Sequence, residues 1–575
     1  MIAWSSFVAA AALALLSGCA STTAPASPPT PAKPSAAVRA CADVQSAFAH
    51  PGLRVLSAEA VAADSLRVPG ITAAMPAHCV VKGRLNERRS PVDGKDYAIG
   101  FEMRLPLQWN GRFFYQANGG LDGFIPPAYG NILGGGPTSN GLLKGFAVLS
   151  SDAGHAFERT NPVIGAALFG RDPQARLDYG YNAVAQLTPM ARALIGFFYG
   201  RPADKAYLVG TSNGGRHGFV SAARDLGAYD GILASAPGYR LPLAALAQVW
   251  GAQRLATIAR TKRADGVPDL ETSLTPAEMA TVARAVLARC DALDGLRDGL
   301  VHDLALCQRA FDAHRDIPVC SGADAEGCLA PQRREVLASL IAGPGFYDGL
   351  PWDSGLAGRN WREWKFVNSI GPRDAIALAY VFTTPPQTAE RLAGGATAVA
   401  EYALGFDVAA GRDSVQARDG VYAHSAMDFM TPPEATAMRA FVARGGRLLV
   451  THGSADPVFS ALDTVRWVEG FQRVHGARAA DHARLFLVPG MNHSSGGPAT
   501  DQFDMVEALV AWVEQGIAPQ GIVAAARGAG SATPNPEVPA DWSPTRTRLL
   551  CPWPSVARYA GSGDPESAAS FRCEP

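Results

Sequence analysis

Short apolar runs that alternate with helical patterns characterise much of the chain. Runs of this length that end in glycine or polar residues predict buried strands, and they occur at 97–105, 112–118, 145–152, 206–209 and 231–236. A longer helical pattern covers Ala183 to Tyr199. Because strands and helices take turns along the chain, the pattern predicts a parallel α/β sheet.

The alternation stops over residues 240–430 and resumes with apolar runs at 446–453 and 483–488. The interrupting stretch holds helical and loop patterns, four of the cysteines and many large aromatic residues. We interpret it as a lid domain, 240–430, inserted into a catalytic domain made of 41–239 and 431–575. Most of its aromatic residues are expected to form its own core, and a minority to face a substrate.

The N-terminal stretch is interpreted as a targeting segment. Phe7 to Leu16 is a short apolar run, and Leu16-Ser17-Gly18-Cys19 resembles a bacterial lipobox, in which the cysteine is lipidated. We expect residues 1–19 to be a signal peptide with a lipobox, and 20–40, rich in Pro, Ala, Ser and Thr, to be a flexible tether. The alternative is an ordinary secretory signal with an incidental cysteine. Either way the protein is expected to be exported, as a periplasmic or outer-membrane-anchored protein.

Composition and charge exclude several classes of protein. Hydrophobic residues make up 48% and charged residues 18% of the 575 residues, which is typical of a globular chain with a large core. The net charge of −1 provides no basic field for nucleic acid. Because no apolar run reaches the length of a membrane span, membrane contact is expected only through a lipid on Cys19. We expect a monomer.

The cysteines predict disulfides. Nine occur, and eight remain when Cys19 is set aside, an even number in a chain that is expected to be exported. Eight cysteines can pair in many ways, so the pairing stays open at this point. Proximity in the sequence favours Cys41–Cys79, Cys290–Cys307, Cys320–Cys328 and Cys551–Cys573.

The motif Gly210-Thr211-Ser212-Asn213-Gly214 joins the predicted strand 206–209 to a predicted helix, 219–224. Strand, tight turn and helix in this order form a nucleophile elbow, in which the residues two before and two after the serine must lack a side chain. Ser212 is therefore a candidate nucleophile, and the Asn213 N–H a candidate donor to an oxyanion. The alternative is a chance motif, because glycine fills 60 of the 575 positions.

Two further residues complete a catalytic triad. Asp456 follows the apolar run 446–453, and His493 follows the run 483–488. Serine, aspartate and histidine in this order, each after a strand, predict an α/β-hydrolase fold with a large inserted lid domain, which explains the long gap before Asp456. Ser212 would attack an ester carbonyl, His493 would move its proton, and Asp456 would orient the imidazole.

A Gly-Gly pair follows the predicted strand 112–118. Small residues let a backbone N–H approach a reacting carbonyl, so Gly120 is a candidate for the second oxyanion donor. The alternative is a plain turn at the end of a strand. His155, His217 and His452 lie near these segments, and we interpret them as structural histidines.

The predicted lid contains an acidic loop between residues 290 and 300. Its carboxylates lie three and four residues apart, with glycines between them, which is typical of a compact site for a hard cation. The alternative is an acidic surface turn, although clustered carboxylates repel one another without a counterion. The candidate Ca²⁺ ligands are the side chains of Asp291, Asp294 and Asp298 and the carbonyls of Leu296 and Leu300.

These motifs resemble those of the tannase and feruloyl esterase family, and the resemblance spans Cys41 to Cys573. It implies the oxyanion role of Gly120, the Ca²⁺ ligands named above and the four cysteine pairs that proximity favours. The segments that carry it are Trp109 to Phe114, the Ser212 elbow, the acidic loop, Gly490-Met491-Asn492-His493 and Cys551-Pro552-Trp553-Pro554.

One departure from the family lies beside the triad. Most members carry a cysteine directly before the nucleophile and another directly after the histidine, joined as a disulfide. Here those positions are Thr211 and Ser494. Because both cysteines are absent together, we predict a hydrogen bond or plain packing in their place, at a small cost in stability or rigidity of the site.

A second departure lies in the lid. A relative that hydrolyses a terephthalate monoester grips the free carboxylate with an arginine four residues before a Phe-Asp pair. Aligned by eye on Phe406-Asp407, that position is Tyr402. The resemblance then predicts no bidentate carboxylate clamp here, unless another arginine substitutes, and substrate contacts by Tyr402 and Phe406 that suit a feruloyl or galloyl ester.

We therefore expect an exported serine carboxylic-ester hydrolase for esters of hydroxycinnamic, gallic or terephthalic-type acids, with a structural Ca²⁺ in the lid. Its expected partner is a small aromatic ester. The alternatives are a hydrolase of terephthalate monoesters proper, a peptidase or amidase, and a catalytically silent binding protein with a hydrolase shell. The three triad residues disfavour the silent protein, and the family resemblance disfavours the peptidase.

Overall fold

A computed structural model describes residues 38–321 and 326–575 of the chain. The described residues belong to one compact unit. The predicted signal peptide, with its lipobox at Cys19, and most of the predicted tether lie outside the described residues. Within the described ranges, no helix is long and apolar enough to cross a membrane.

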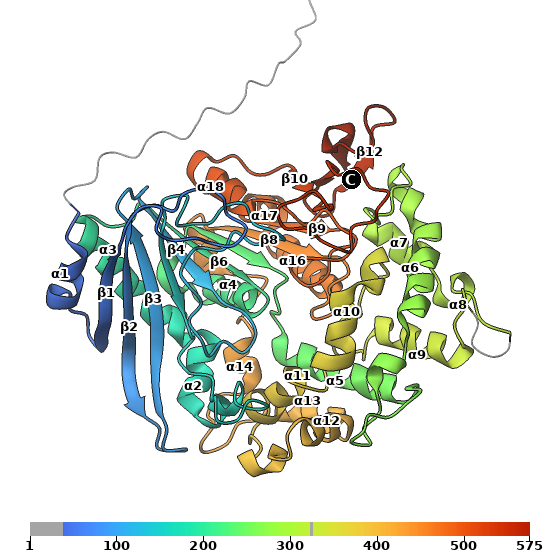
Figure 1. Cartoon of the computed structure of the whole chain (residues 1–575), viewed down its shortest axis with the longest axis horizontal. Helices are drawn as coiled ribbons and strands as arrows, with labels where there is room; N and C mark the ends of the chain where they lie inside the picture. The colour runs from blue at the N-terminus through green and yellow to red at the C-terminus, as the bar shows by residue number, and fades with distance from the viewer. Residues whose placement is uncertain (1–37, 322–325) are drawn as a thin grey trace, which may run out of the picture. The chain divides into compact units, whose positions relative to one another are not determined.

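Nine strands form one large sheet in the order β1-β2-β3-β5-β4-β6-β7-β8-β9 (Figure 1). β1, β2 and β3 pair antiparallel, and β3 is also antiparallel to β5. From β5 to β9 every neighbouring pair is parallel, so the predicted parallel sheet is confirmed and has an antiparallel extension. The strands are β1 (Leu53–Val61), β2 (His78–Arg89), β3 (Asp96–Pro106), β4 (Arg112–Ala117), β5 (Ala147–Ser151), β6 (Lys205–Thr211), β7 (Gly231–Ser235), β8 (Arg447–Gly453) and β9 (Ala483–Val488).

β6 lies in the middle of the parallel part, between β4 and β7. Leu208 belongs to one apolar core, whereas its neighbours Tyr207 and Val209 belong to another. Because successive strand residues point to opposite faces, these cores lie on opposite faces of the sheet. Helix α4 (Asn213–Arg224) packs on β6, and α18 (Met505–Gln515) packs on β7 and β8. Burial on both faces explains the continuous apolar run of β6.

The other helices of the catalytic part include α3, which covers the predicted range Ala183–Tyr199. Two small two-stranded sheets, β10 with β11 and β12 with β13, lie near the C-terminus. The remaining bounds in this part are α1 (Cys41–Ala47), α2 (Pro173–Leu177), α15 (Arg439–Ala443), α16 (Ala461–His475), α17 (Ala479–His482), β10 (Ile522–Ala525), β11 (Thr547–Leu550), β12 (Val556–Tyr559) and β13 (Phe571–Glu574).

The insertion leaves the sheet after β7 and returns to it at β8, and Figure 1 draws its helices in green to orange. Helix α5 is its centre, because α9, α11, α12, α13 and α14 all pack on it. Trp361, Tyr380 and Phe382 are fully buried, as expected of core aromatics. The division into a catalytic domain and a lid domain, 240–430, stays a prediction. Its helices are α5 (Leu241–Ala256), α6 (Pro276–Cys290), α7 (Leu304–Ala310), α8 (Ala313–Asp316), α9 (Pro331–Ala342), α10 (Arg359–Glu363), α11 (Asp374–Ala377), α12 (Ala396–Leu404), α13 (Val408–Ser414) and α14 (Ala426–Met430).

Four disulfides connect the cysteines of the described residues, and the four predicted pairs are confirmed. The first ties α1 to β2, the next two lie in the insertion, and the last joins the C-terminal strand β13 to the segment after β11. Such bonds form and persist in oxidising compartments. The pairs are Cys41–Cys79, Cys290–Cys307, Cys320–Cys328 and Cys551–Cys573.

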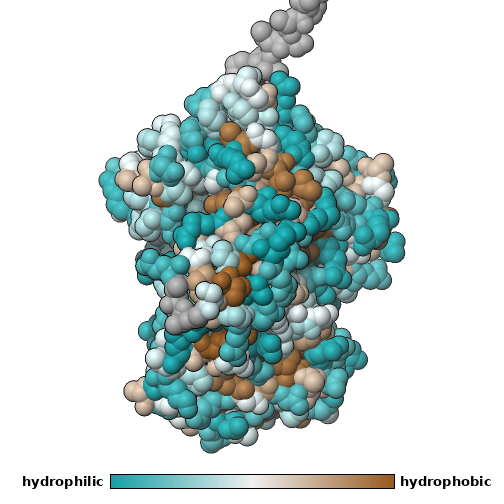
Figure 2. Space-filling view, turned by 90° about the vertical axis from the view of Figure 1, so that its right-hand side faces the viewer, coloured by the Kyte–Doolittle hydropathy of each residue, from teal (hydrophilic) through white to brown (hydrophobic). Residues whose placement is uncertain are grey.

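The face of the molecule in Figure 2 is largely hydrophilic. Apolar side chains appear on it as separate brown patches between hydrophilic ones. Scattered apolar side chains of this kind are normal on a globular protein and by themselves indicate no partner.

Candidate active site

The turn between β6 and α4 has the geometry of a nucleophile elbow. Ser212 adopts φ 63° and ψ −125°, a strained backbone for a residue with a side chain. A Cβ atom on Gly210 would lie 2.5 Å from the backbone of Gly214, and one on Gly214 would lie 2.4 Å from the carbonyl oxygen of Ala117. Both glycines are therefore required by close backbone contacts, as the sequence predicts, and chance does not explain the motif.

Asp456 and His493 meet at the carboxyl ends of two parallel strands. Asp456 follows β8 and His493 follows β9, and His493 Nδ1 lies 2.7 Å from Asp456 Oδ2. Because a carboxylate only accepts, Nδ1 carries the proton and Nε2 is left as the basic nitrogen. The other oxygen of Asp456 accepts hydrogen bonds from Val458 N at 2.7 Å and Phe459 N at 3.1 Å.

Ser212 and His493 are brought side by side through their neighbours. Thr211, directly before the serine, and Ser494, directly after the histidine, have their hydroxyl oxygens 2.6 Å apart. Of the two predicted alternatives, a hydrogen bond or plain packing, the structure has the hydrogen bond. Among the described residues, Ser212 Oγ makes no hydrogen bond to His493, and such bonds are often long before substrate binds.

His452 is part of the same cluster, which sequence reasoning did not detect. Its Nε2 lies 3.2 Å from both Asp456 Oδ2 and the carbonyl oxygen of Phe459, and its Nδ1 lies 2.9 Å from Thr464 Oγ1. Burial acts to raise the pKa of Asp456, but the electrostatic interaction with His493 and the hydrogen bonds from both histidines outweigh it. The pKa of Asp456 therefore lies below its usual range and the group is ionised.

Gly120 lies in a loop directly beside Ser212. A Cβ atom on the preceding Gly119 would be 3.5 Å from Cβ of Ser212, and Gly120 itself has φ 65°. The hydroxyl of Tyr179 donates to the carbonyl oxygen of Gly120 at 3.0 Å and helps to hold this loop in place. Asn213 is the first residue of α4, so its N–H is one of the free donors at the helix start. The two predicted oxyanion donors thus flank the nucleophile.

A buried polar network lies behind these donors. Asn213 Nδ2 donates to Asp122 Oδ2 at 2.9 Å, and its Oδ1 accepts from Arg216 Nε at 2.6 Å. Arg216 also donates to the carbonyl oxygen of Tyr179. His217 Nε2 lies 3.4 Å from Asp122 Oδ2, and burial lowers its pKa well below the usual value. His217 therefore acts as a neutral structural residue, as predicted.

His155 is also buried and structural. Its Nε2 donates to the carbonyl oxygen of Leu121 at 2.7 Å, and its ring stacks on Phe169. Burial lowers its pKa to about 4, so it is neutral at physiological pH. It thus supports the loop that carries Gly120.

The pocket above Ser212 is mainly apolar and is built by both parts of the chain. The insertion supplies about half of its lining, including Trp364, Arg373 and Phe382. Trp364 and Phe459 also contact the ring of His493, with ring centroids 5.7 and 5.5 Å away. The full lining is Gly120, Leu121, Tyr179, Ser212, Asn213, Leu241, Trp364, Arg373, Asp374, Ala377, Phe382, Val458 and Phe459.

The insertion is hydrogen bonded to the loop that carries the acid. Gln248, on α5, donates from Nε2 to the carbonyl oxygens of Pro457 and Val458 at 2.8 and 2.7 Å. Its Oε1 accepts from the buried Lys365 Nζ at 2.9 Å. The residues directly after Asp456 are thus held by a side chain of the lid.

Tyr402 and Phe406 contact each other, with ring centroids 5.5 Å apart. Neither lines the pocket that contains Ser212; the aromatic residues of the insertion that do so are Trp364 and Phe382. Substrate binding by Tyr402 and Phe406 therefore stays a prediction.

In the acidic loop, Asp291 Oδ1 accepts from the N–H of Asp298 at 2.9 Å, and Asp298 Oδ2 accepts from Arg548 Nε at 2.7 Å. Asp294 Oδ2 is buried and has no partner. Burial, and then the charges of Asp298 and Asp291, raise the pKa of Asp294 to about 7. No group of three or more His, Cys, Asp or Glu side chains arranged to hold a metal occurs in the part of the chain that the structure describes. Calcium at this loop, with the carbonyls of Leu296 and Leu300, stays a prediction.

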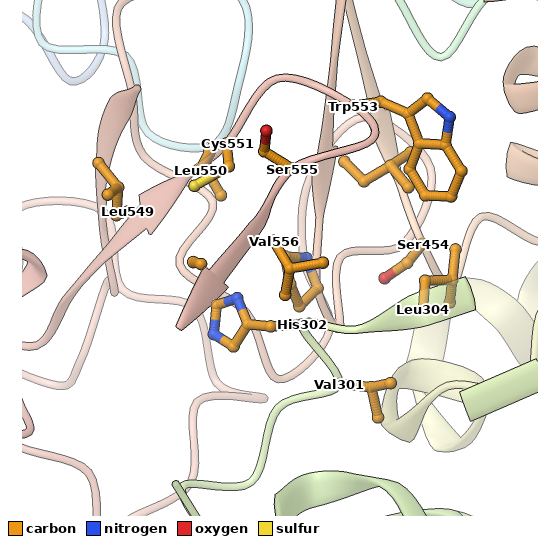
Figure 3. A pocket seen from close by; sticks show the side chains of 13 residues that line it. Val301, His302, Leu304, Ser454, Leu549, Leu550, Cys551, Trp553, Ser555 and Val556 are labelled. Atoms are coloured by element: carbon orange, nitrogen blue, oxygen red, sulfur yellow. The ribbon is translucent and has the colours of Figure 1, made fainter. Parts of the chain in front are cut away.

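A second cavity lies between the segment after the acidic loop and the C-terminal strands (Figure 3). Val301, His302, Trp553 and Val556 line it, together with Ser454. The hydroxyl of Ser454 donates to Asp353 Oδ2 at 2.7 Å. Because the cavity contains none of the triad residues, it does not belong to the active site.

A family model described as tannase and feruloyl esterase matches residues 79–574. The chain belongs to the tannase and feruloyl esterase family. This family member is 40% identical over 543 residues to mono(2-hydroxyethyl) terephthalate hydrolase of Piscinibacter sakaiensis. The matched region covers 89% of this chain and 87% of that protein. It is 25% identical over 495 residues to a probable feruloyl esterase B-1 of Aspergillus fumigatus, with 82% of each chain covered.

The fold of this family member is shared with solved structures. Feruloyl esterase B from Aspergillus oryzae matches with a TM-score of 0.67 and 20% identity, over 93% of this chain and 99% of that chain. The α/β-hydrolase fold is thus confirmed, and as a tannase and feruloyl esterase family member the protein is a carboxylic ester hydrolase.

Replacing both Thr211 and Ser494 by cysteine is expected to form a disulfide, because the two hydroxyl oxygens already lie 2.6 Å apart and 283 residues separate them in sequence. A cross-link over a loop of this length stabilises by about 2–4 kcal/mol. We expect the melting temperature to rise by several degrees, with no more free thiols than in the wild type. The reduced double variant is the control; two additional titratable thiols under oxidising conditions, or an unchanged melting temperature, would contradict the geometry.

Asp122→Asn is expected to remove a loss of stability at high pH. Burial raises the pKa of Asp122 to about 8, against the opposing charge of Arg216, whereas an unfolded aspartate has a pKa of about 4. A raised folded-state pKa means that the stability of the neutral form is present below about pH 4 and is lost as the pH rises to about 8. The melting temperature of the variant minus that of the wild type should therefore increase from pH 5 to pH 9. A difference that does not change with pH would refute the raised pKa.

Proposed function

We propose that this carboxylic ester hydrolase works by an acyl-enzyme mechanism at Ser212, His493 and Asp456. Ser212 Oγ attacks the ester carbonyl, His493 Nε2 takes its proton and returns it to the leaving alcohol, and a water then repeats the sequence on the acyl-enzyme. Asp456 holds the imidazole in the tautomer that leaves Nε2 basic. The N–H groups of Gly120 and Asn213 stabilise the oxyanion.

The observation that carries this proposal is the 2.7 Å contact between His493 Nδ1 and Asp456 Oδ2, beside a strained serine at a nucleophile elbow. A buried carboxylate that orients an imidazole near a half-buried serine is an arrangement suited to acyl transfer. Because a strained backbone costs stability, strain at Ser212 is not expected in a binding protein without catalytic activity.

We propose esters of aromatic carboxylic acids as the substrate class. The pocket that contains Ser212 has Trp364, Phe382 and Phe459 in its lining, which suits a flat apolar ring. Relatives named for a terephthalate ester and for feruloyl esters agree with this class.

We also propose that Ca²⁺ binds the acidic loop, through Asp291, Asp294 and Asp298 and the carbonyls of Leu296 and Leu300. The buried, unpartnered Oδ2 of Asp294 supports this, because a buried carboxylate oxygen without a donor is costly unless a cation satisfies it. The ion would hold the loop together and take no part in the reaction.

We propose that the protein is exported, and four disulfides support an oxidising compartment. A lipid on Cys19 would make it an anchored lipoprotein, and the protein would act as a monomer.

Ser212→Ala is expected to lower kcat/KM for p-nitrophenyl acetate at least about a thousandfold, because the attacking group is removed. Ser221→Ala, on the same helix, is the matched control and should keep activity, since its hydroxyl has no partner. Activity retained by the Ser212 variant would overturn the proposed mechanism.

Removal of calcium is expected to lower the melting temperature, because an ion that binds only the folded state stabilises it. The comparison is between excess EGTA and added CaCl₂, for the wild type and for Asp294→Asn. The wild type should shift by several degrees and the variant much less. Equal melting temperatures for the wild type in the two conditions would refute a calcium site.

A further inference from the structure

A strongly basic side chain lies at the rim of the mainly apolar active-site pocket. Arg373 lines this pocket together with Ser212 and Gly120. Its Nη1 is 3.6 Å from the position that a Cβ atom on Gly120 would occupy, so the guanidinium lies directly against the oxyanion loop. Arg373 is exposed, in contrast to the buried pocket-wall residue Phe382.

The guanidinium of Arg373 is not used by the fold. Among the residues that the structure describes, none forms a hydrogen bond or an ion pair with it. The adjacent carboxylate of Asp374 accepts from Trp364 Nε1 at 3.2 Å instead. Buried Arg216, below the same pocket, differs in this respect, because its nitrogens donate to two backbone carbonyls and to Asn213 Oδ1.

Asp374 also lines the pocket and acts electrostatically on Arg373, but burial raises the pKa of its carboxyl to about 7, so only part of the protein carries this opposing charge at neutral pH. Lys365, which acts electrostatically on Asp374, is buried and donates to Gln248 Oε1. The Oδ2 atom of Asp456 contacts His493 Nδ1 and His452 Nε2, and Asp456 does not line the pocket. Among the described residues, Arg373 is therefore the cation without a hydrogen-bond partner that a substrate ring in this pocket would meet.

We propose that Arg373 recognises a carboxylate on the substrate and selects aromatic esters that carry one, such as monoesters of benzene dicarboxylic acids. The inference rests on the proposed function of Ser212, since it assigns the substrate of that same site. A guanidinium presents paired N–H donors that match a carboxylate, and a neutral ester offers it no charged partner. Arg373 would thus provide a carboxylate contact that position 402 does not offer.

The site is open to solvent, so the contact is expected to be moderate. Exposed ion pairs are weak, whereas bidentate pairs beside an apolar wall are stronger. We expect a preference for the charged ester of about tenfold, and we expect added salt to reduce it through screening.

The test compares two esters with the same ring and the same scissile bond, monomethyl terephthalate, which is an anion, and dimethyl terephthalate, which is neutral. The ratio of kcat/KM for the anion over the neutral ester is measured for wild type, Arg373→Gln, Arg373→Lys and Arg391→Gln. Arg391 is the matched control, because it is an exposed lid arginine that does not line the pocket.

We expect Arg373→Gln to lower the ratio about tenfold, mainly through KM of the anion, and Arg373→Lys to restore part of it. Arg391→Gln should leave the ratio unchanged, and 0.5 M NaCl should lower it only where Arg373 is present. If Arg373→Gln changes kcat/KM equally for both esters, or changes it for neither, the inference is overturned. Activity on the neutral ester would still leave the proposed function intact. A wild type that hydrolyses p-nitrophenyl acetate but neither terephthalate ester would overturn the inference alone, whereas one that hydrolyses none of the three esters would overturn the proposed function as well.

Discussion

The buried carboxylate of Asp456 is the constraint on which the site depends. A charge that is removed from water is costly unless donors surround it. Here two backbone N–H groups hold one oxygen, and His493 and His452 hold the other. Because these donors come from the strand end, the following turn and the loop after β9, the charge fixes three segments of chain relative to one another.

The insertion is part of this arrangement as well as the cover of the pocket. Gln248 donates to the two carbonyls that directly follow Asp456, and Lys365 donates in turn to Gln248. A displacement of α5 would therefore disturb the turn that holds the acid. At the same time the insertion supplies Trp364, Phe382 and Arg373 to the pocket, so substrate selection and the support of the triad come from the same segment.

Much of the site could be predicted from the sequence because its chemistry follows strand ends. Ser212, Asp456 and His493 each come directly after an apolar run, and parallel strands bring such positions to one edge of the sheet. The absence of two cysteines in a chain that resembles a disulfide-bonded family predicted that Thr211 and Ser494 meet, by a hydrogen bond or by plain packing, and the structure has the hydrogen bond.

Other features depend on tertiary packing and have no local signal. The approach of His452 to Asp456 requires the bend after β8. The antiparallel pairing of β1 to β3 does not follow from the hydrophobic runs, because such runs do not indicate the direction of a strand. The position of Arg373 depends on how the inserted helices dock. An alignment on one Phe-Asp pair drew attention to Phe406, whereas the phenylalanine of the insertion that lines the pocket is Phe382.

The most direct test of the central claim is covalent labelling of the nucleophile. The wild-type protein is treated with a fluorophosphonate, which reacts with serines activated by a neighbouring base, and the modified residue is mapped by mass spectrometry. The account predicts one adduct, on Ser212, that forms much more slowly when His493 is replaced by alanine. An adduct on another residue, or labelling of Ser212 at the same rate without His493, would contradict it.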